Sequence, residues 1–185
     1  MIIGITGTDG SGKGTVVDYL VHKKGFAHYS ARAYITKEIE KRGLPIDRNH
    51  MRLVGNDLRR IHGTDHIVRY YLNEIKKNGD TNAVIESIRE STAAECIKKE
   101  GGILLSVDAN QHLRYERVQK RRSLSDHVSF EQFVIHEELE MNDPDPHGMH
   151  KREVMDMADY TITNNGTLPE LHEQVEEVFK KLPLD

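Results

Sequence analysis

The chain begins Met1-Ile2-Ile3-Gly4-Ile5-Thr6-Gly7-Thr8-Asp9-Gly10-Ser11-Gly12-Lys13-Gly14-Thr15, and this segment is the most informative part of the sequence about its structure. Residues 1–6 form an almost continuous apolar run, which is typical of a strand buried on both faces of a parallel sheet. The glycine-rich residues that follow have the spacing of a phosphate-binding P-loop, which is Gly, four residues, then Gly-Lys. Only glycines let the backbone turn tightly enough to aim several N–H donors at one point. The position between a buried strand and a helix distinguishes such a loop from a chance glycine-rich turn.

The P-loop predicts that the chain binds the phosphates of ATP. A helix that begins at Lys13 would add its N-terminal dipole and free N–H groups to the loop. The ammonium group of Lys13 would supply positive charge for the β and γ phosphates, so we expect Lys13 to be catalytic. The loop residues expected to bind ATP are Gly7, Asp9, Gly10, Ser11, Gly12, Lys13, Gly14 and Thr15.

The composition is that of a soluble globular protein, and we expect one domain spanning residues 1–185. Hydrophobic residues make up 37% of the chain, charged residues make up 30%, and the formal net charge is −4. This charge balance argues against sequence-independent binding to nucleic acid and against a polybasic membrane contact. The single cysteine cannot form an internal disulfide, and the first apolar run is too short for a signal peptide or a membrane span. We therefore expect a cytoplasmic monomer or homodimer whose partners are small-molecule nucleotides.

Short apolar runs alternate with longer amphipathic stretches along the whole chain. Strands are expected at residues 1–6, 26–29, 82–86, 103–107 and 159–163, and helices at 13–24, 31–42, 49–61, 65–77, 91–99, 111–122, 130–141 and 168–180. Prolines and a glycine in residues 142–150 predict a loop. This order predicts an α/β protein with an about five-stranded parallel sheet and helices on both faces. In such sheets, ligands bind beyond the carboxyl ends of the strands.

The sequence Gly12-Lys13-Gly14-Thr15 departs from the general P-loop pattern, which has Ser or Thr directly after the lysine. It resembles the version found in nucleoside monophosphate kinases of the adenylate kinase type. That resemblance implies a three-layer P-loop kinase fold with a small lid, and Mg²⁺ bound with ATP as the cofactor. It also implies that Thr15 contacts phosphate or the magnesium shell, although the displaced threonine leaves direct ligation of the metal open.

Asp9 is an acid inside a loop that binds anions, which is electrostatically unfavourable. It resembles the Asp in the Asp-Gly-x-Gly-Lys loop of thymidylate kinases, where the carboxylate reaches toward the sugar of the acceptor nucleotide. The alternative is a solvated residue that favours a turn. Thymidylate kinase itself is disfavoured, because its Asp-Arg-aromatic motif after the third strand is missing.

The third predicted strand runs into Val84-Ile85-Glu86-Ser87-Ile88-Arg89. This segment resembles the Asp-Gly-x-x-Arg segment of nucleotide kinases, shortened by one residue, and the Asp-Gly-Ile-Arg form of dephospho-coenzyme A kinase-like proteins. A carboxylate at such a strand end can hold metal-bound water, and an arginine just beyond it can bind a phosphate through two N–H groups. The resemblance makes Glu86 the candidate for the magnesium shell and Arg89 a candidate for the acceptor phosphate. For Arg89 the alternative is a surface salt bridge.

A basic helix is expected after the fourth strand, with Arg114, Arg117 and Arg121 on one face. Its sequence resembles the start of the lid in adenylate kinases, and the lid would occupy about residues 117–130. This likeness implies that Arg117 stacks on the base of the donor and that Arg121 reaches the phosphates, so both are expected to be catalytic. The alternative is a solvated basic face that pairs with the acidic helix after it.

Loops at the remaining strand ends add candidates for both substrates. Asn164 and Asn165 follow the last strand and resemble the adenine-side loop of these kinases, with a plain turn as the alternative. Between the second and third strands, at about residues 30–80, nucleotide kinases have their acceptor-binding region. In that region Arg59 is the first candidate for the acceptor phosphate and Arg32 the second.

The acceptor decides which reaction the site would perform. A nucleoside monophosphate carries an anionic phosphate as nucleophile and needs alignment and charge neutralisation rather than a general base. A hydroxyl acceptor does better with a nearby carboxylate, and dephospho-coenzyme A kinases carry an Asp there, shortly after the second strand. Residues 29–34 contain no acid but do contain Arg32, which favours a nucleoside monophosphate kinase. A dephospho-coenzyme A kinase-like enzyme and a regulatory module that binds or hydrolyses ATP are the alternatives.

Overall fold

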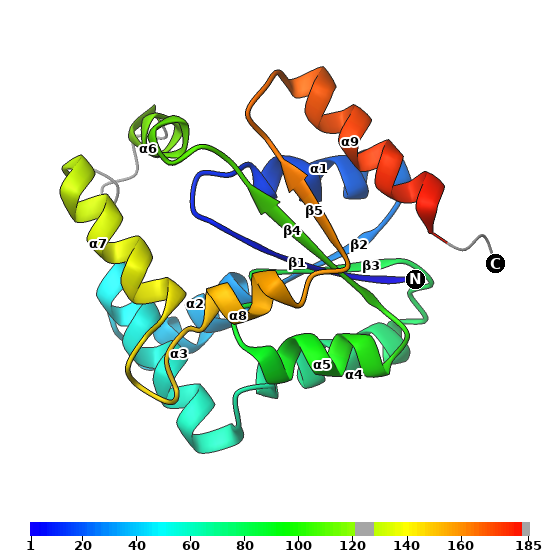
Figure 1. Cartoon of the computed structure of the whole chain (residues 1–185). Helices are drawn as coiled ribbons and strands as arrows, with labels where there is room; N and C mark the ends of the chain where they lie inside the picture. Colours follow the sequence, from blue (N-terminus) through cyan, green and yellow to red (C-terminus); the bar gives the residue numbers. More distant parts are fainter. Residues whose placement is uncertain (121–127, 183–185) are drawn as a thin grey trace.

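Five parallel strands form the centre of the structure, a computed structural model that describes residues 1–120 and 128–182. The strands are β1 (Ile2–Gly7), β2 (Ala27–Ser30), β3 (Ala83–Glu86), β4 (Ile103–Asp108) and β5 (Tyr160–Thr163), in the spatial order β2-β3-β1-β4-β5 (Figure 1). In the central strand β1, Ile5 is aligned with Glu86 of β3 on one side and with Leu105 of β4 on the other. The predicted α/β fold with a five-stranded parallel sheet is confirmed.

Helices cover both faces of this sheet. They are α1 (Lys13–Lys24), α2 (Ala31–Lys41), α3 (Arg48–His62), α4 (His66–Asn78), α5 (Ser91–Lys99), α6 (Gln111–Lys120), α7 (Phe130–Met141), α8 (Lys151–Asp156) and α9 (Leu168–Lys181). On one face, α1 and α9 pack against Ile3 and Ile5; on the other, α4, α5 and α8 pack against Ile85 and Leu104 (Figure 1). Burial on both faces explains the continuous apolar runs of the strands. Within the described ranges, no helix is both long enough and apolar enough to cross a membrane.

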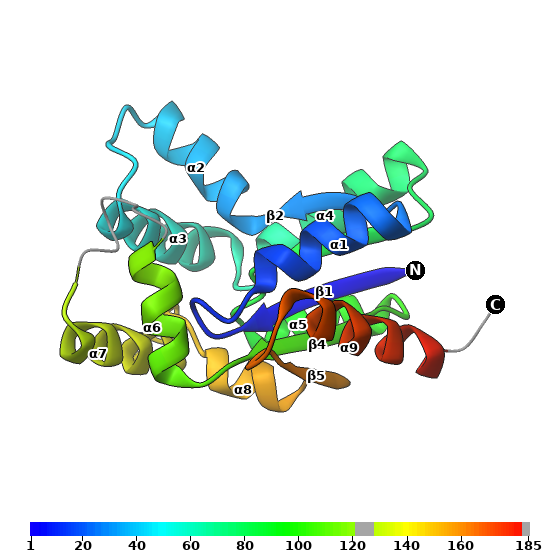
Figure 2. The same cartoon turned by 90° about the horizontal axis from the view of Figure 1, so that it is seen from above.

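The remaining helices extend beyond the end of the sheet at which β1 terminates. Figure 2 shows α2 and α3 on one side of this end and α6 and α7 on the other. Ile39, Val54 and Leu58 give α2 and α3 a small apolar core of their own. Tyr115 of α6 contacts the ring of Phe133 on α7, which holds these two helices together. Two helical arms therefore flank the carboxyl ends of the strands.

The short helix α8 has no counterpart among the predicted elements. It follows the proline-containing loop directly, and the side chain of its N-cap residue, His150, makes no capping hydrogen bond. A helix of this length is also too short to show a periodic apolar pattern. The other described elements begin and end within one residue of the predicted ones, except α6, which is described to Lys120. The tertiary packing of α8, rather than a local signal, therefore determines its position.

Ser87 has a φ of 68°, the only positive φ of a non-glycine residue in the described ranges. It comes directly after Glu86, at the carboxyl end of β3. Glycine stands at this place in the Asp-Gly-Ile-Arg pattern that the segment resembles. The left-handed conformation brings the Cβ of an L-residue close to a carbonyl oxygen, at a cost of about 1 kcal/mol. Ser87 thus keeps the backbone path of a glycine while carrying a side chain.

Replacing Ser87 with glycine should raise the free energy of unfolding by up to about 1 kcal/mol, because the strain at the Cβ disappears. Urea denaturation followed by circular dichroism measures this change as a higher midpoint at an unchanged slope. Ser87→Ala is the matched control, since it keeps the Cβ and should bring no gain. An equal gain in both variants would show that the hydroxyl, and not the backbone conformation, destabilises this position.

Candidate functional site

The P-loop connects β1 to α1, and three of its glycines hold backbone conformations that favour glycine. The φ angles of Gly7, Gly10 and Gly12 are 127°, 79° and 100°. A Cβ added at Gly7 would lie 2.0 Å from the carbonyl oxygen of Val107 on β4, and one at Gly10 would lie 2.5 Å from the carbonyl oxygen of Arg114 on α6. Both distances are far below van der Waals contact, so these positions require glycine for space as well as for conformation.

The loop and the first turn of α1 present free backbone donors. In residues 1–120 and 128–182, no hydrogen bond uses the N–H of Gly10, Gly12, Lys13, Gly14 or Thr15. A Cβ built at Gly14 would meet no atom within 4 Å, so the space beside this turn is open. Unpaired N–H groups at a helix N-terminus, next to open space, form an anion site. The geometry therefore fits the phosphate chain of a nucleotide.

Lys13 lies inside this loop and is held by it. Its Nζ donates to the carbonyl oxygens of Gly7 at 2.9 Å and Thr8 at 2.5 Å. Its distance to Oδ1 of Asp9 is 3.8 Å. Burial lowers the pKa of Lys13 to about 7, and the carboxylate of Asp9 only partly opposes this effect. The free protein thus holds Lys13 near its titration point, where a bound phosphate would favour the charged form.

Asn164 fixes the other side of the loop. Its Nδ2 donates to the carbonyl oxygen of Ser11 at 2.7 Å, and its own carbonyl oxygen accepts from Nη1 of Arg117 at 2.9 Å. The structure therefore brings Arg117 and Asn164 together beside the P-loop. Oδ1 of Asn165 accepts from the backbone N–H of Asn110 and so ties the same loop to the start of α6. Arg121, the other predicted lid arginine, lies outside the described residues.

Glu86 and Thr15 are the predicted contributors to a magnesium site. Glu86 shares the α1 face of the sheet with Val84, and its Oε1 accepts from Oγ of Ser30 at 2.6 Å and lies 3.4 Å from Nε2 of His28. Thr15 belongs to the first turn of α1, and its hydroxyl makes no hydrogen bond to a described residue. In the described part of the chain, no three His, Cys, Asp or Glu residues come together in a group that could hold a metal ion. This donor set fits Mg²⁺ that is held mainly by nucleotide phosphates, with one or two protein ligands.

The three arginines predicted for the acceptor differ in their surroundings. Arg32 is exposed on α2 and makes no ion pair with a described residue. Arg59 is buried, and its guanidinium bonds Glu90 at 2.6 Å as well as the backbone carbonyl oxygen of His147 at 2.7 Å. Burial lowers the pKa of Arg59, although Glu90 raises it. In this structure Arg59 therefore joins α3 to the two segments that contain Glu90 and His147.

Arg89 is one of five charged groups that alternate in sign from the P-loop outward: Lys13, Asp9, Lys151, Glu140 and Arg89. Nζ of Lys151 lies 3.0 Å from Oδ1 of Asp9 and also donates to Oε2 of Glu140. Nη1 of Arg89 lies 3.9 Å from the same Glu140 oxygen. Although burial raises the pKa of Asp9, Lys151 and Lys13 hold it well below its usual value. Asp9 is therefore a carboxylate at neutral pH.

Lys151 and Glu140 had no signal in the sequence. Lys151 begins a helix without a recognisable start, and it is 142 residues away from Asp9 along the chain. Glu140 is one of several acids on α7 and matches no motif. A lysine whose side chain is 4% exposed is nevertheless rare without a partner of opposite charge. Only the folded arrangement reveals this pair.

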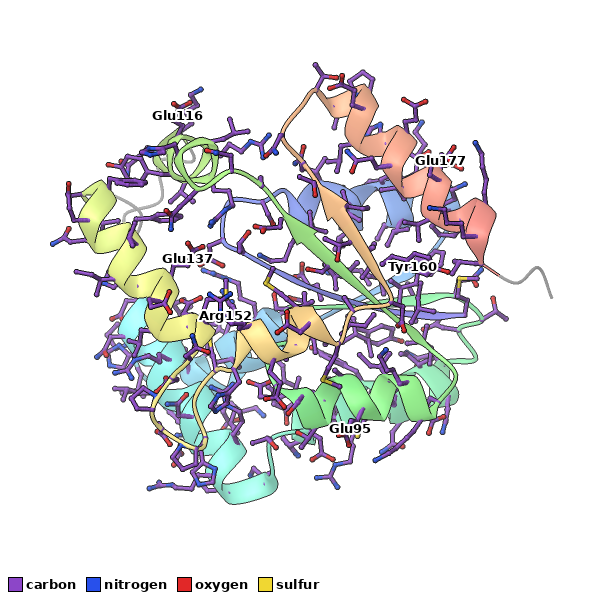
Figure 3. All side chains as sticks on the ribbon, in the orientation of Figure 1. Glu95, Glu116, Glu137, Arg152, Tyr160 and Glu177 are labelled. Carbon is purple, nitrogen blue, oxygen red and sulfur yellow. The ribbon has the colours of Figure 1, made fainter. Side chains whose placement is uncertain are left out.

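A cavity of about 230 Å³ lies next to Thr8 of the P-loop, between α6, α7 and α8. Thr8 and Asp108 form one wall of it, and Oδ1 of Asp108 accepts from Oγ1 of Thr8 at 2.6 Å. Figure 3 labels Glu137 of α7 and Arg152 of α8, which line the cavity as well. Arg114, predicted to share a face with Arg117, pairs here with Glu137 of the acidic helix, but it is buried and does not belong to a solvated face.

Comparisons with known proteins agree with this geometry. The sequence pattern of the AAA domain family matches residues 3–133. The UPF0200 protein of Methanosarcina mazei is 31% identical over 181 residues, which cover 96% of this chain and 93% of that protein. The UPF0200 protein of Methanococcus maripaludis is 28% identical over 184 residues, covering 98% and 97%. The crystal structure of shikimate kinase from Bacteroides thetaiotaomicron superposes with a TM-score of 0.63 at 15% identity, covering 97% of this chain and 98% of that one, a likeness that shows the fold.

Two glycine substitutions should distinguish effects on the stability of the protein from effects on nucleotide binding by the P-loop. A Cβ at Gly12 would lie 2.3 Å from Nδ2 of Asn164. Gly12→Ala should therefore break the hydrogen bond from Asn164 to the carbonyl oxygen of Ser11 and abolish nucleotide binding. Gly14→Ala meets no atom and should stabilise α1 by about 0.5–1 kcal/mol. Its methyl group should nevertheless weaken nucleotide binding by entering the open space. Thermal unfolding and binding of a fluorescent ATP analogue test both variants, and unchanged binding in Gly14→Ala would place the phosphates elsewhere.

Nucleotide binding should take up protons above neutral pH. With a pKa of about 7, Lys13 is mostly neutral at about pH 8 in the free protein, whereas bound phosphates favour its charged form. The affinity for ATP should therefore fall as the pH rises above 7. Calorimetry at about pH 8, in two buffers of different ionisation enthalpy, measures the uptake. Lys13→Arg is the control, because arginine stays charged and should bind ATP with no such uptake.

Proposed function

This chain belongs to the UPF0200 family and contains an AAA domain, and we propose that it is a P-loop kinase. It would transfer the γ-phosphoryl group of ATP to a small phosphorylated acceptor, most favourably a nucleoside monophosphate. One observation carries the proposal: the free N–H groups and Lys13 lie at the carboxyl edge of the sheet, between two helical arms. A donor held at this edge would present its γ phosphate to an acceptor held at the neighbouring strand ends.

The residues of the site supply what phosphoryl transfer needs, which is alignment and neutralisation of charge. The N–H groups of the P-loop would hold the donor phosphates, and Lys13 would stabilise the charge that spreads over the transferring group. Arg117 would contact the donor nucleotide from α6, and Arg121 would reach the phosphates, as the resemblance to the lid of adenylate kinases implies. Bound Mg²⁺ would neutralise charge between the β and γ phosphates, with Thr15 and Glu86 as the candidate protein contacts.

The cations on the acceptor side support a phosphorylated acceptor. Arg32, two residues after the end of β2, is exposed, and Arg89, three residues after the end of β3, is partly exposed. Although burial acts in the opposite direction, the carboxylates of Glu140 and Asp9 raise the pKa of Arg89, so it stays charged. Two permanent charges next to adjacent strand ends suit a monophosphate, which also needs no general base.

A hydroxyl acceptor is the second candidate, and one contact favours it. Residues 29–34 contain no acid, but the carboxylate of Glu86 reaches Ser30 at the end of β2 from the neighbouring strand. Glu86 would then accept the proton of an attacking hydroxyl group. A dephospho-coenzyme A kinase-like reaction would use it in that way.

An ADP-release assay with ATP and Mg²⁺ distinguishes these acceptors. The panel contains the common ribo- and deoxyribonucleoside monophosphates, dephospho-coenzyme A and shikimate. We expect turnover with one monophosphate. Turnover only with a hydroxyl acceptor would replace the first candidate with the second, and silence across the panel with ATP still bound would favour a regulatory ATP-binding module.

With the active acceptor, Lys13→Ala and Arg121→Ala should each lower kcat by at least about a hundredfold. Each variant lacks a positive charge that would stabilise the transferring phosphoryl group. Circular dichroism should show both variants folded. Lys180→Met is the control, because Lys180 forms an exposed pair with Glu177 at the end of α9. Full activity in either of the first two variants would refute the assignment of that residue.

A further inference from the structure

The P-loop contains an electrostatic conflict that the proposed function leaves unexplained. Asp9 is a carboxylate within a loop that must attract phosphates, and its Oδ1 lies 3.8 Å from Nζ of Lys13. A carboxylate near the phosphates repels them, and it also competes with them for the lysine. Binding of ATP therefore requires that the charge of Asp9 be taken up by another group.

Lys151 is placed to neutralise the charge of Asp9. It is the first residue of α8, its side chain is 4% exposed, and its Nζ donates to Oδ1 of Asp9 at 3.0 Å. Glu140 of α7, whose side chain is 11% exposed, holds the same Nζ from the other side. Burial makes the contact between Lys151 and Glu140 stronger than it would be in water, whereas the Asp9 side chain is 34% exposed. Lys151 is thus fixed against the P-loop by residues from two other parts of the chain.

The two lysines near Asp9 interact with its carboxylate in different ways. Lys151 makes a hydrogen bond to Oδ1, whereas the 3.8 Å distance from Lys13 is too long for one. The hydrogen bonds of Lys13 go to the backbone carbonyls of Gly7 and Thr8 instead. These carbonyl bonds carry no countercharge, so the charge of Lys13 can be directed at a phosphate.

We propose that Lys151 is a positioning residue of the nucleotide site: it binds Asp9 so that the charge of Lys13 remains available to the donor phosphates. This inference rests on the proposed binding of ATP and not on the identity of the acceptor. Lys151 acts through Asp9 and need not touch the nucleotide.

The test measures ATP binding to the full chain by calorimetry, without any acceptor. Lys151→Met should weaken binding by about five- to a hundredfold, the usual range of coupling between two sites. Adding Asp9→Asn to Lys151→Met should restore most of the affinity, because the competing carboxylate is gone. Lys151→Arg keeps the charge and should retain most of the affinity, and Lys180→Met should behave as the wild type.

Wild-type affinity in Lys151→Met would overturn the inference, and so would a loss that Asp9→Asn does not restore. Should Lys151→Met fail to fold, the comparison of Asp9→Asn with the double variant decides. Equal affinities support the inference, and a further loss in the double variant overturns it. Absence of ATP binding to the folded wild type would refute the nucleotide site itself, and the inference with it.

Discussion

The structure depends on one constraint, which is that several backbone N–H groups must point at the same place. That requirement forces the P-loop into conformations that bring its glycines against three different elements. Gly7 packs on the backbone of β4, Gly10 on the backbone of α6, and Gly12 on the side chain of Asn164 after β5. These contacts require β4 to lie beside β1 and β5 to end next to the loop. The conformation of the P-loop thus depends on the packing of the sheet.

The parts that could be predicted from the sequence are those with a local signal. The P-loop, the strands and nearly all the helices are marked by glycines, apolar runs and caps, and the structure has them within a residue of the expected ends. Contacts between distant segments carry no such mark. The partner of Asp9 is Lys151, on a short helix without a capping bond, and the partner of Arg59 is Glu90. Whether an arginine faces a substrate or a carboxylate depends on these tertiary contacts.

The carboxylate expected after β2 is a second example of a feature that the sequence alone did not reveal. An acid was sought just after β2 and is absent there, yet a carboxylate reaches Ser30 from β3. Adjacent parallel strands end at one edge, so a functional group required at one strand end can be supplied by its neighbour. The alignment of Ser30 with Glu86 in the sheet creates this possibility. A search for motifs within one segment of the sequence does not detect a carboxylate that a neighbouring strand supplies.

The separate apolar core of α2 and α3 has a consequence for how such a protein can evolve. Ile39, Val54 and Leu58 pack with one another and contribute nothing to the two cores of the sheet. Substitutions in this small core can change how α2 and α3 pack without loosening the sheet that positions the P-loop. These two helices can therefore change in sequence while the P-loop keeps its conformation. If the proposed function holds, a lineage built on this chain would change its acceptor by mutations confined to α2 and α3.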